Sequence, residues 1–281
     1  MLRYLLVLTV LVAACEAPLP DYDPDAGTLP LSCFEPVTGG VFLTGLTAPL
    51  PGCTAPQQDA GVMGLDAGFW KAGGVLVVPP SAPGMPLPLV IAFHPAGGSG
   101  VGVRNQLGME AAADGGAIFV YPNAPRGTWD LGQADGVAVD LLLRSLSRAY
   151  CIDPARIHIA GFSAGAVFTL YLGCNVPSTF RSMAVVAGTE DRFDTRCCKD
   201  PISALFIHGT NDQTISAGEG HNAADEVGKR DGCGINTTLV NGCDVYTSCP
   251  APHEVSFCPW EGAHEVPDWG GPAIWNFFSG G

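Results

Sequence analysis

Basic residues are scarce in this chain of 281 residues. Lysine and arginine together number 13 against 27 acidic residues, which gives a formal net charge of −14 at pH 7. No basic run is present to neutralise successive phosphate groups, so nucleic acid is not an expected partner. Charged residues make up only 14% of the chain and hydrophobic residues 47%, which excludes disorder throughout. The 37 glycines and 24 prolines follow no Gly-X-Y period, which excludes a collagen-like triple helix.

The apolar stretch at the N-terminus, residues 4–14, is shorter than the roughly 20 residues that a membrane-spanning helix needs. One basic residue, Arg3, precedes this stretch and Cys15 follows it, which is the layout of a secretory signal. Residues 12–15, Val-Ala-Ala-Cys, resemble a bacterial lipobox, in which the cysteine carries a lipid and begins the mature chain. We therefore predict a lipoprotein signal peptide over 1–14 and lipidation at Cys15. The alternative is an ordinary signal peptide with a chance cysteine.

Residues 15–32 are acidic and rich in proline, so we expect an extended tether between a lipid anchor on a membrane surface and a folded domain. No internal repeat and no second linker follow, and we predict one domain over 33–281. The predicted location is outside the cytoplasm, either as a lipoprotein of a bacterial cell envelope or as a secreted protein. We expect a monomer.

Eleven cysteines are too many for a typical cytosolic enzyme of this size and indicate an oxidising compartment. With Cys15 assigned to lipidation, an even number remains. The candidates for disulfide bonds are Cys33, Cys53, Cys151, Cys174, Cys197, Cys198, Cys233, Cys243, Cys249 and Cys258. Their pairing cannot be read from the sequence, although the neighbours Cys197 and Cys198 are expected to bridge to different partners. Free buried thiols are the alternative.

Short apolar runs alternate with stretches of helical length, a pattern that predicts a mostly parallel sheet with helices on both faces. The predicted strands are 74–78, 87–93, 117–121, 156–160, 183–187, 204–208 and 255–258. The predicted helices are 137–150, 166–172, 225–230 and 272–278. The expected fold class is therefore α/β.

Residues 161–165, Gly-Phe-Ser-Ala-Gly, match the pattern G-x-S-x-G. The pattern alone is weak, but it directly follows a predicted strand and directly precedes a predicted helix made of small residues. That context is typical of a nucleophile elbow, in which a strained turn exposes the serine hydroxyl above the sheet. We therefore predict Ser163 as a nucleophile; a structural serine in a glycine-rich turn is the alternative.

A serine nucleophile needs a histidine as its base and an acidic residue that orients the histidine. In α/β-hydrolases the acidic residue follows the serine in the chain, and the histidine follows the acidic residue. His264 lies in a loop just past the predicted strand 255–258, where an imidazole can reach over the serine. His253 lies before that strand and His221 lies in a polar stretch, and both stay open as alternatives.

The acid is expected past the carboxyl end of a strand, where active sites of open α/β sheets lie. Asp212, four residues after His208, meets that condition and would orient the histidine base. Asp191 and Asp194 are weaker candidates, and His208 is expected to brace the loop.

An oxyanion hole needs two backbone N–H groups. The first is expected from Ala164, which follows the nucleophile. The second is expected from the loop 94–98, where Pro95 has no N–H and Ala96 is the preferred donor. A plain glycine turn is the alternative interpretation of that loop.

In these residues the chain resembles extracellular esterases of the feruloyl esterase and polyhydroxybutyrate depolymerase type, a branch of the α/β-hydrolases. The resemblance runs from about residue 33 to the C-terminus. It rests on the His94 loop, Tyr121-Pro122 with Trp129, 151–153, 161–165, 180–181, 187–188, 208–212, 231–233, and the His264 loop with 275–278. The chain departs from the family at Pro95 and Ala263, which stand where the family often has other residues.

The resemblance implies the triad Ser163, Asp212 and His264, an acyl-enzyme, and no metal or organic cofactor. It implies a secreted serine esterase, with feruloyl esters of plant cell-wall polysaccharide as the expected substrate. Hydrolysis of a hydroxyalkanoate polyester is the alternative, and a non-catalytic surface lipoprotein that only binds is an alternative of another class. Residues that could line the substrate pocket are His94, Trp129, Trp260 and Trp269.

If the ten cysteines of the mature chain are paired, the denatured but unreduced protein should show almost no free thiol. Thiol titration before and after reduction measures this directly. Several reactive thiols per chain before reduction would contradict the disulfide assignment.

Overall fold

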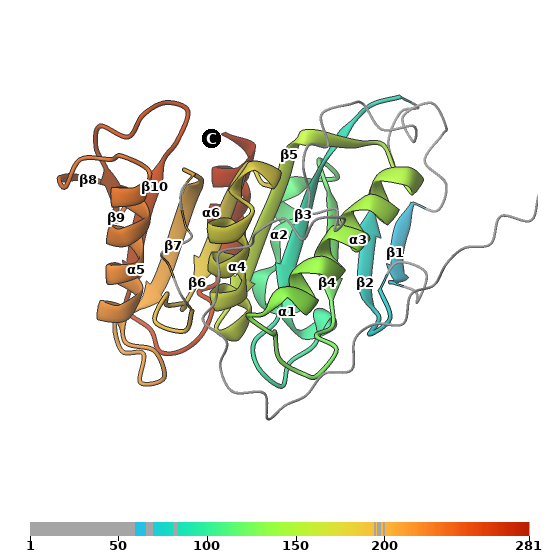
Figure 1. The fold of residues 1–281 in the computed structure, drawn as a ribbon, viewed down its shortest axis with the longest axis horizontal. Helices are drawn as coiled ribbons and strands as arrows, with labels where there is room; N and C mark the ends of the chain where they lie inside the picture. Colours follow the sequence, from blue (N-terminus) through green and yellow to red (C-terminus); the bar gives the residue numbers. More distant parts are fainter. Residues whose placement is uncertain are drawn as a thin grey trace, which may run out of the picture. The chain divides into compact units, whose positions relative to one another are not determined.

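The computed structural model describes residues 60–65, 70–80, 84–193, 195, 198 and 200–280. Within them the chain forms a ten-stranded sheet in the order β1-β2-β4-β3-β5-β6-β7-β10-β9-β8 (Figure 1). The strands are β1 Gly61–Gly64, β2 Gly74–Val78, β3 Leu87–Phe93, β4 Ile118–Pro122, β5 Ile152–Phe162, β6 Ser182–Val186, β7 Ser203–Gly209, β8 Thr237–Val240, β9 Cys243–Tyr246 and β10 Val255–Trp260. The helices are α1 Gly100–Leu107, α2 Met109–Ala113, α3 Gln133–Ala149, α4 Ala164–Asn175, the 3₁₀ turn η2 Pro177–Thr179, α5 Ala217–Arg230 and α6 Gly270–Ser279.

The centre of the sheet is parallel. Strands β4, β3, β5, β6, β7 and β10 run in the same direction, and antiparallel pairs close both edges. All seven residues of β3 are buried, as expected for a strand that is covered on both faces. Leu89, Ile91 and Phe93 pack in the core beneath α3, α4 and α5, whereas Val90 and Ala92 pack beneath α1, α2 and α6. The predicted α/β class is confirmed.

Several predicted boundaries were wrong. The strands predicted over 74–78 and 87–93 have those bounds, but the helix predicted over 225–230 begins much earlier, at Ala217. A capping box between Ser216 and Glu219 starts this helix, with each side chain bonded to the other residue's backbone N–H. Helices α1 and α2, the two edge strands β1 and β8, and the strand β9 next to β8 were not predicted. Strand β8 is exposed along its whole length, and the side chain of Leu239 is 72% exposed.

Three disulfides join described residues: Cys174–Cys198, Cys233–Cys249 and Cys243–Cys258. Cys151 is also disulfide-bonded. These bonds confirm the oxidised state for seven of the ten candidate cysteines. Cys198 bridges to a residue other than its neighbour, as predicted. Cys15, Cys33, Cys53 and Cys197 lie outside the described residues.

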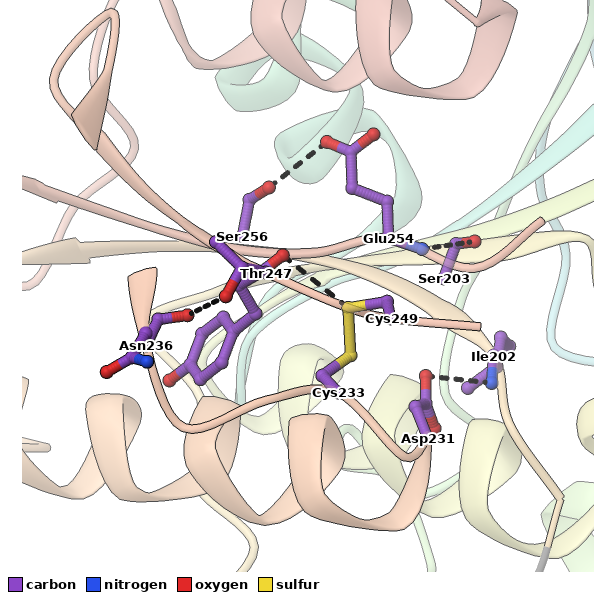
Figure 2. The surroundings of a disulfide bond; sticks show 10 residues. Ile202, Ser203, Asp231, Cys233, Asn236, Thr247, Cys249, Glu254 and Ser256 are labelled. Carbon is purple, nitrogen blue, oxygen red and sulfur yellow. Dashed lines mark hydrogen bonds between the residues drawn. A yellow bond between two sulfur atoms is a disulfide. The ribbon is translucent and has the colours of Figure 1, made fainter. Parts of the chain in front are cut away.

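The Cys233–Cys249 disulfide lies at the amino ends of β7 and β10 (Figure 2). It ties the segment after α5 to the segment that leads into β10. Beside it, a carboxylate oxygen of Asp231 accepts a hydrogen bond of 3.2 Å from the amide of Ile202, directly before β7. The amide of Glu254, directly before β10, donates a bond of 3.2 Å to the hydroxyl of Ser203. The amino ends of two neighbouring strands are thus held by a covalent bond and a set of polar contacts.

Among the described residues, no helix combines the length and the apolar character that crossing a membrane requires. The predicted signal peptide over 1–14, the tether over 15–32 and the first residues of the predicted domain lie outside the described residues.

We predict that Asp231 makes stability fall with rising pH. Burial raises the pKa of this carboxyl group from 3.8 to about 7, more than the Ile202 amide and Arg230 lower it. The folded state therefore holds a proton that the unfolded state releases, and this contribution is complete below about pH 4 and lost as pH rises toward 7. Because asparagine cannot ionise, Asp231→Asn should gain stability relative to wild type between pH 4 and pH 8, by an amount of up to about 4 kcal/mol.

Urea unfolding of both proteins at several pH values measures this difference. Asp200→Asn, which removes an exposed carboxylate, is the matched control for the loss of one negative charge. A stability difference between Asp231→Asn and wild type that does not change with pH would contradict the prediction.

Candidate active site

Ser163 occupies the turn between β5 and α4 with a backbone conformation that L residues rarely adopt. Its φ is 54° and its ψ is −119°. Its amide donates a hydrogen bond of 2.9 Å to the carbonyl oxygen of Val186 at the end of β6. A Cβ atom at Gly161 would overlap the backbone of Gly165, so glycine is needed for strand and helix to pass this closely. The residue pattern and the strained turn together have the geometry of a nucleophile elbow.

Gly165 brings the start of α4 against the end of β3. A Cβ atom there would overlap the carbonyl oxygen of Phe93, so no other residue fits without moving the backbone. Ala164 therefore lies near the loop that begins at His94. Among the described residues, neither the Ala164 amide nor the Ala96 amide donates a hydrogen bond to another protein group. The two N–H groups predicted to form an oxyanion hole are therefore both free to donate a hydrogen bond to a ligand.

Asp212 lies three residues beyond the end of β7, and its side chain is fully buried. One carboxylate oxygen accepts hydrogen bonds from the amides of Thr214 at 2.8 Å and Ile215 at 3.0 Å. Burial opposes ionisation, but the hydrogen bonds from His264 and from these two amides outweigh it and lower the pKa of Asp212. The group is therefore a carboxylate at neutral pH.

His264 contacts both other predicted residues. Its Nδ1 lies 2.7 Å from the second carboxylate oxygen of Asp212, and its Nε2 lies 2.8 Å from the hydroxyl oxygen of Ser163. Because an ionised carboxylate can only accept, Nδ1 carries the proton and a neutral ring accepts the Ser163 hydroxyl proton at Nε2. The ring packs against Phe162 with 5.2 Å between ring centroids. The structure thus brings together a hydroxyl, an imidazole and a carboxylate from the ends of three strands.

His208 braces the acid loop, as the sequence suggested. Its Nε2 lies 2.9 Å from the carbonyl oxygen of Ile215 and 3.4 Å from the carboxylate of Asp212. Gly220 of α5 packs directly on the ring, where a Cβ atom would overlap it. The ring is 2% exposed and has no route to a substrate.

The other candidate bases and acids lie elsewhere. His221 is on α5, with its Nδ1 3.8 Å from a carboxylate oxygen of Asp225 and its ring against Phe257. His253 precedes β10, at the end of the sheet opposite Ser163. Asp191 follows β6 in a turn and accepts no side-chain bond from a histidine among the described residues. Asp194 lies outside the described residues.

Two predicted pocket residues are buried instead, which corrects that prediction. His94 is fully buried, and both of its ring nitrogens contact backbone groups. Nδ1 lies 2.7 Å from the carbonyl oxygen of Pro95, and Nε2 accepts a hydrogen bond of 2.8 Å from the amide of Ala124. Burial lowers the pKa of His94, in keeping with a neutral ring. Trp129 donates from Nε1 to the carbonyl oxygen of His94 at 2.8 Å and stacks on Phe168. Both side chains support the Ala96 loop from inside.

Trp269 immediately precedes α6 and is 41% exposed, so it is available to a ligand. Trp260, the third tryptophan predicted to line the pocket, is the last residue of β10, which extends two residues beyond the predicted strand 255–258. Sequence reasoning missed Asn123, whose side chain accepts from the amide of Gly100 at 2.8 Å and donates to the carbonyl oxygen of Ala72 at 3.0 Å. An asparagine directly after the strand that ends at Pro122 was the available signal for a residue that anchors a loop.

Among the described residues, no group of three or more His, Cys, Asp or Glu side chains is arranged to hold a metal ion. The expectation that no cofactor is needed stays a prediction.

No protein-family model matches the chain. Its sequence is similar to a probable feruloyl esterase C of Aspergillus terreus, with 29% identity over 272 residues that cover 87% of this chain and 96% of the relative. It is also similar to the feruloyl esterase C of Emericella nidulans, with 28% identity over 284 residues that cover 89% and 95% of the two chains. The chain resembles fungal feruloyl esterases. The resemblance that the motifs suggested is confirmed.

The structure is similar to that of an acetyl xylan esterase from Aspergillus awamori, with a TM-score of 0.62 and 16% identity. The match covers 78% of this chain and all of the other. At this level of identity the likeness shows the fold alone, and that fold is an α/β-hydrolase fold.

We predict that the Ser163 backbone is strained and that glycine relieves the strain. Ser163→Gly and Ser163→Ala both remove the hydroxyl group, but only glycine adopts φ 54° and ψ −119° without steric cost. Ser163→Gly should therefore be more stable than Ser163→Ala by about 1 kcal/mol or more, even though glycine has the larger conformational entropy when unfolded. Equal stability of the two variants in urea unfolding would show that the turn stores no strain.

Proposed function

We propose that this chain is a serine esterase that hydrolyses carboxylic esters through an acyl-enzyme. The observation that carries the proposal is the position of His264, with one ring nitrogen 2.8 Å from the Ser163 hydroxyl and the other 2.7 Å from the Asp212 carboxylate. The similarity to proteins named feruloyl esterase supports the same reaction class.

In the proposed reaction, Ser163 Oγ attacks the carbonyl carbon of the ester while its proton passes to Nε2 of His264. Asp212 holds the proton on Nδ1 and stabilises the imidazolium that forms. The negative charge that develops on the carbonyl oxygen is accepted by the N–H groups of Ala96 and Ala164. The close contact of Gly165 with β3 holds the Ala164 amide in place, and the buried side chains of His94 and Trp129 hold the loop that carries the Ala96 amide.

Collapse of the tetrahedral intermediate breaks the bond to the alcohol, and the imidazolium donates its proton to the leaving oxygen. A water molecule then attacks the acyl-enzyme with His264 again as the base. The carboxylic acid leaves and the serine hydroxyl is restored. Apart from the ester and this water molecule, the proposed steps use side chains and amides of this chain.

The proposed substrates are ester groups on plant cell-wall polysaccharides, with feruloyl esters first. Relatives in sequence are named feruloyl esterase C, and a bifunctional acetylxylan esterase and xylanase of Neocallimastix patriciarum is 30% identical over 111 residues, which cover 38% of this chain and 16% of that protein. Trp269, which is exposed and lies five residues after His264 in the chain, is a candidate surface for an aromatic acyl group.

We place this activity outside the cytoplasm. The disulfides among the described residues support export, because such bonds persist in oxidising compartments. The lipid anchor at Cys15, the envelope location and the monomeric state remain predictions.

The first test is reaction with a fluorophosphonate probe and with p-nitrophenyl acetate. Wild type should be labelled and should turn over the ester. Ser163→Ala should lose all labelling, and Asp212→Asn should lose about 10⁴-fold in kcat because the histidine is no longer held in the correct tautomer. Absence of labelling and turnover in folded wild type would favour the non-catalytic binding protein instead.

The second test compares substrates. Release of ferulate from methyl ferulate, acetate from acetylated xylan and hydroxybutyrate from its oligomers should be measured with the same enzyme preparation. We expect methyl ferulate to give the highest kcat/KM. A value for methyl ferulate no better than the background on p-nitrophenyl acetate would remove the feruloyl assignment, and preference for the oligomers would establish the polyester alternative.

A further inference from the structure

The loops that carry Asp212 and His264 are bonded directly to each other. The parallel ladder between β7 and β10 ends at Gly209 opposite Trp260. Beyond it the amide of Thr210 donates to the carbonyl oxygen of Trp260 at 2.8 Å, and the amide of Asn211 donates to that of Gly262 at 2.9 Å. The two loops therefore continue the strand pairing past the edge of the sheet, up to the acid and the base.

Close approach of the two loops depends on Gly209. A Cβ atom at this position would lie well inside 3.0 Å of the carbonyl oxygens of both Gly262 and Ala263. Because these are backbone atoms, no side-chain movement could relieve the overlap. Any larger residue at 209 must push the His264 loop away from the Asp212 loop.

The turn that carries His264 folds back over the indole of Trp260. The amide of Gly262 donates to the carbonyl oxygen of Trp260 at 2.9 Å. A Cβ atom at Gly262 would overlap the outer atoms of the six-membered indole ring, Cη2, Cζ2 and Cζ3. The indole Nε1 is buried and has no hydrogen-bond partner among the described residues, although Trp260 as a whole is partly exposed.

We propose that Trp260 is a positioning residue for His264, which rests on the proposed function. The turn 261–263 packs on the indole, and this contact sets the distance of the His264 imidazole from the sheet. Gly209 lets the acid loop bond to the same turn. The two fix His264 so that its bonds to Asp212 and Ser163 form together. A displacement of about 1 Å at such a site costs on the order of 100-fold in rate.

The first experiment is a compensation test. Gly262→Ala should lower kcat at least tenfold with KM changed less than threefold, because the added methyl group lifts the turn off the indole. Trp260→Phe should restore most of kcat when combined with Gly262→Ala, since a phenyl ring is too short to reach the added methyl group. Trp260→Phe alone should lower kcat more than threefold, because the shorter phenyl ring leaves the turn without its contact, and the methyl group of the double variant fills part of that gap. A double variant no faster than Gly262→Ala would overturn the proposal.

Gly209→Ala is the contrasting variant. Its methyl group meets backbone oxygens, so Trp260→Phe should not rescue it, and rescue would contradict the proposed geometry. Gly218→Ala in α5 is the control glycine, because its Cβ would meet only the Ser216 hydroxyl oxygen at 3.8 Å. This control should keep wild-type kcat and stability.

A readout independent of turnover separates this inference from the proposed function. The proton between His264 Nδ1 and Asp212 should give a downfield ¹H NMR signal in wild type, and the signal should be lost in Gly262→Ala and return in the double variant. If wild type hydrolyses nothing, the proposed function fails while the NMR comparison still decides the role of Trp260. If Gly262→Ala does not fold, Trp260→Ala decides: unchanged kcat and an unchanged signal would overturn the role.

Discussion

One rigid imidazole ring has to satisfy two partners that belong to different strands. Ser163 follows β5, Asp212 follows β7 and His264 follows β10, and β6 lies between the first two strands in the sheet. The ring cannot stretch, so both hydrogen bonds form only if the loops after these strands have fixed heights and fixed separations. Much of the local structure can be understood as a solution to that constraint, from the strained turn at Ser163 to the paired loops beyond β7 and β10.

The two ends of the parallel sheet meet this requirement in different ways. At the amino ends of β7 and β10 a disulfide, a buried carboxyl group and a serine hydroxyl hold the strands. At the carboxyl ends the loops are held by close backbone contact, and glycines at 161, 165 and 209 permit that contact. No disulfide among the described residues joins the loops that carry Ser163, Asp212 and His264, so non-covalent contacts set the geometry where these side chains must react and exchange protons.

The sequence was informative where chemistry requires a particular residue type in a particular order. Gly161-Phe162-Ser163 after an apolar strand, a carboxylate after a later strand and a histidine after the last strand were enough to nominate the three side chains that meet in space. Residues whose role depends on packing could not be assigned in the same way. His94 was expected beside a substrate but is fully buried, with one ring nitrogen against the carbonyl oxygen of the next residue, Pro95, and the other bonded to the amide of Ala124, 30 residues away.

Strand β8 was not predicted, because its residues are exposed and its register comes from β9. Cysteine pairing was equally beyond the sequence, because many pairings of ten cysteines are compatible with the same spacing.

The Cys233–Cys249 disulfide and the Asp231 contact, at the amino ends of β7 and β10, also affect which parts of the protein can be changed by evolution or by engineering. Because this anchorage is at the opposite end of the strands from Ser163, loops above the nucleophile can be exchanged without touching the bonds that keep β7 and β10 in register. Surface residues such as Trp269 are therefore suitable positions for combinatorial libraries aimed at new acyl groups. Gly209 and Gly262 are not, since an added carbon at 209 would overlap backbone oxygens and one at 262 would overlap the indole of Trp260.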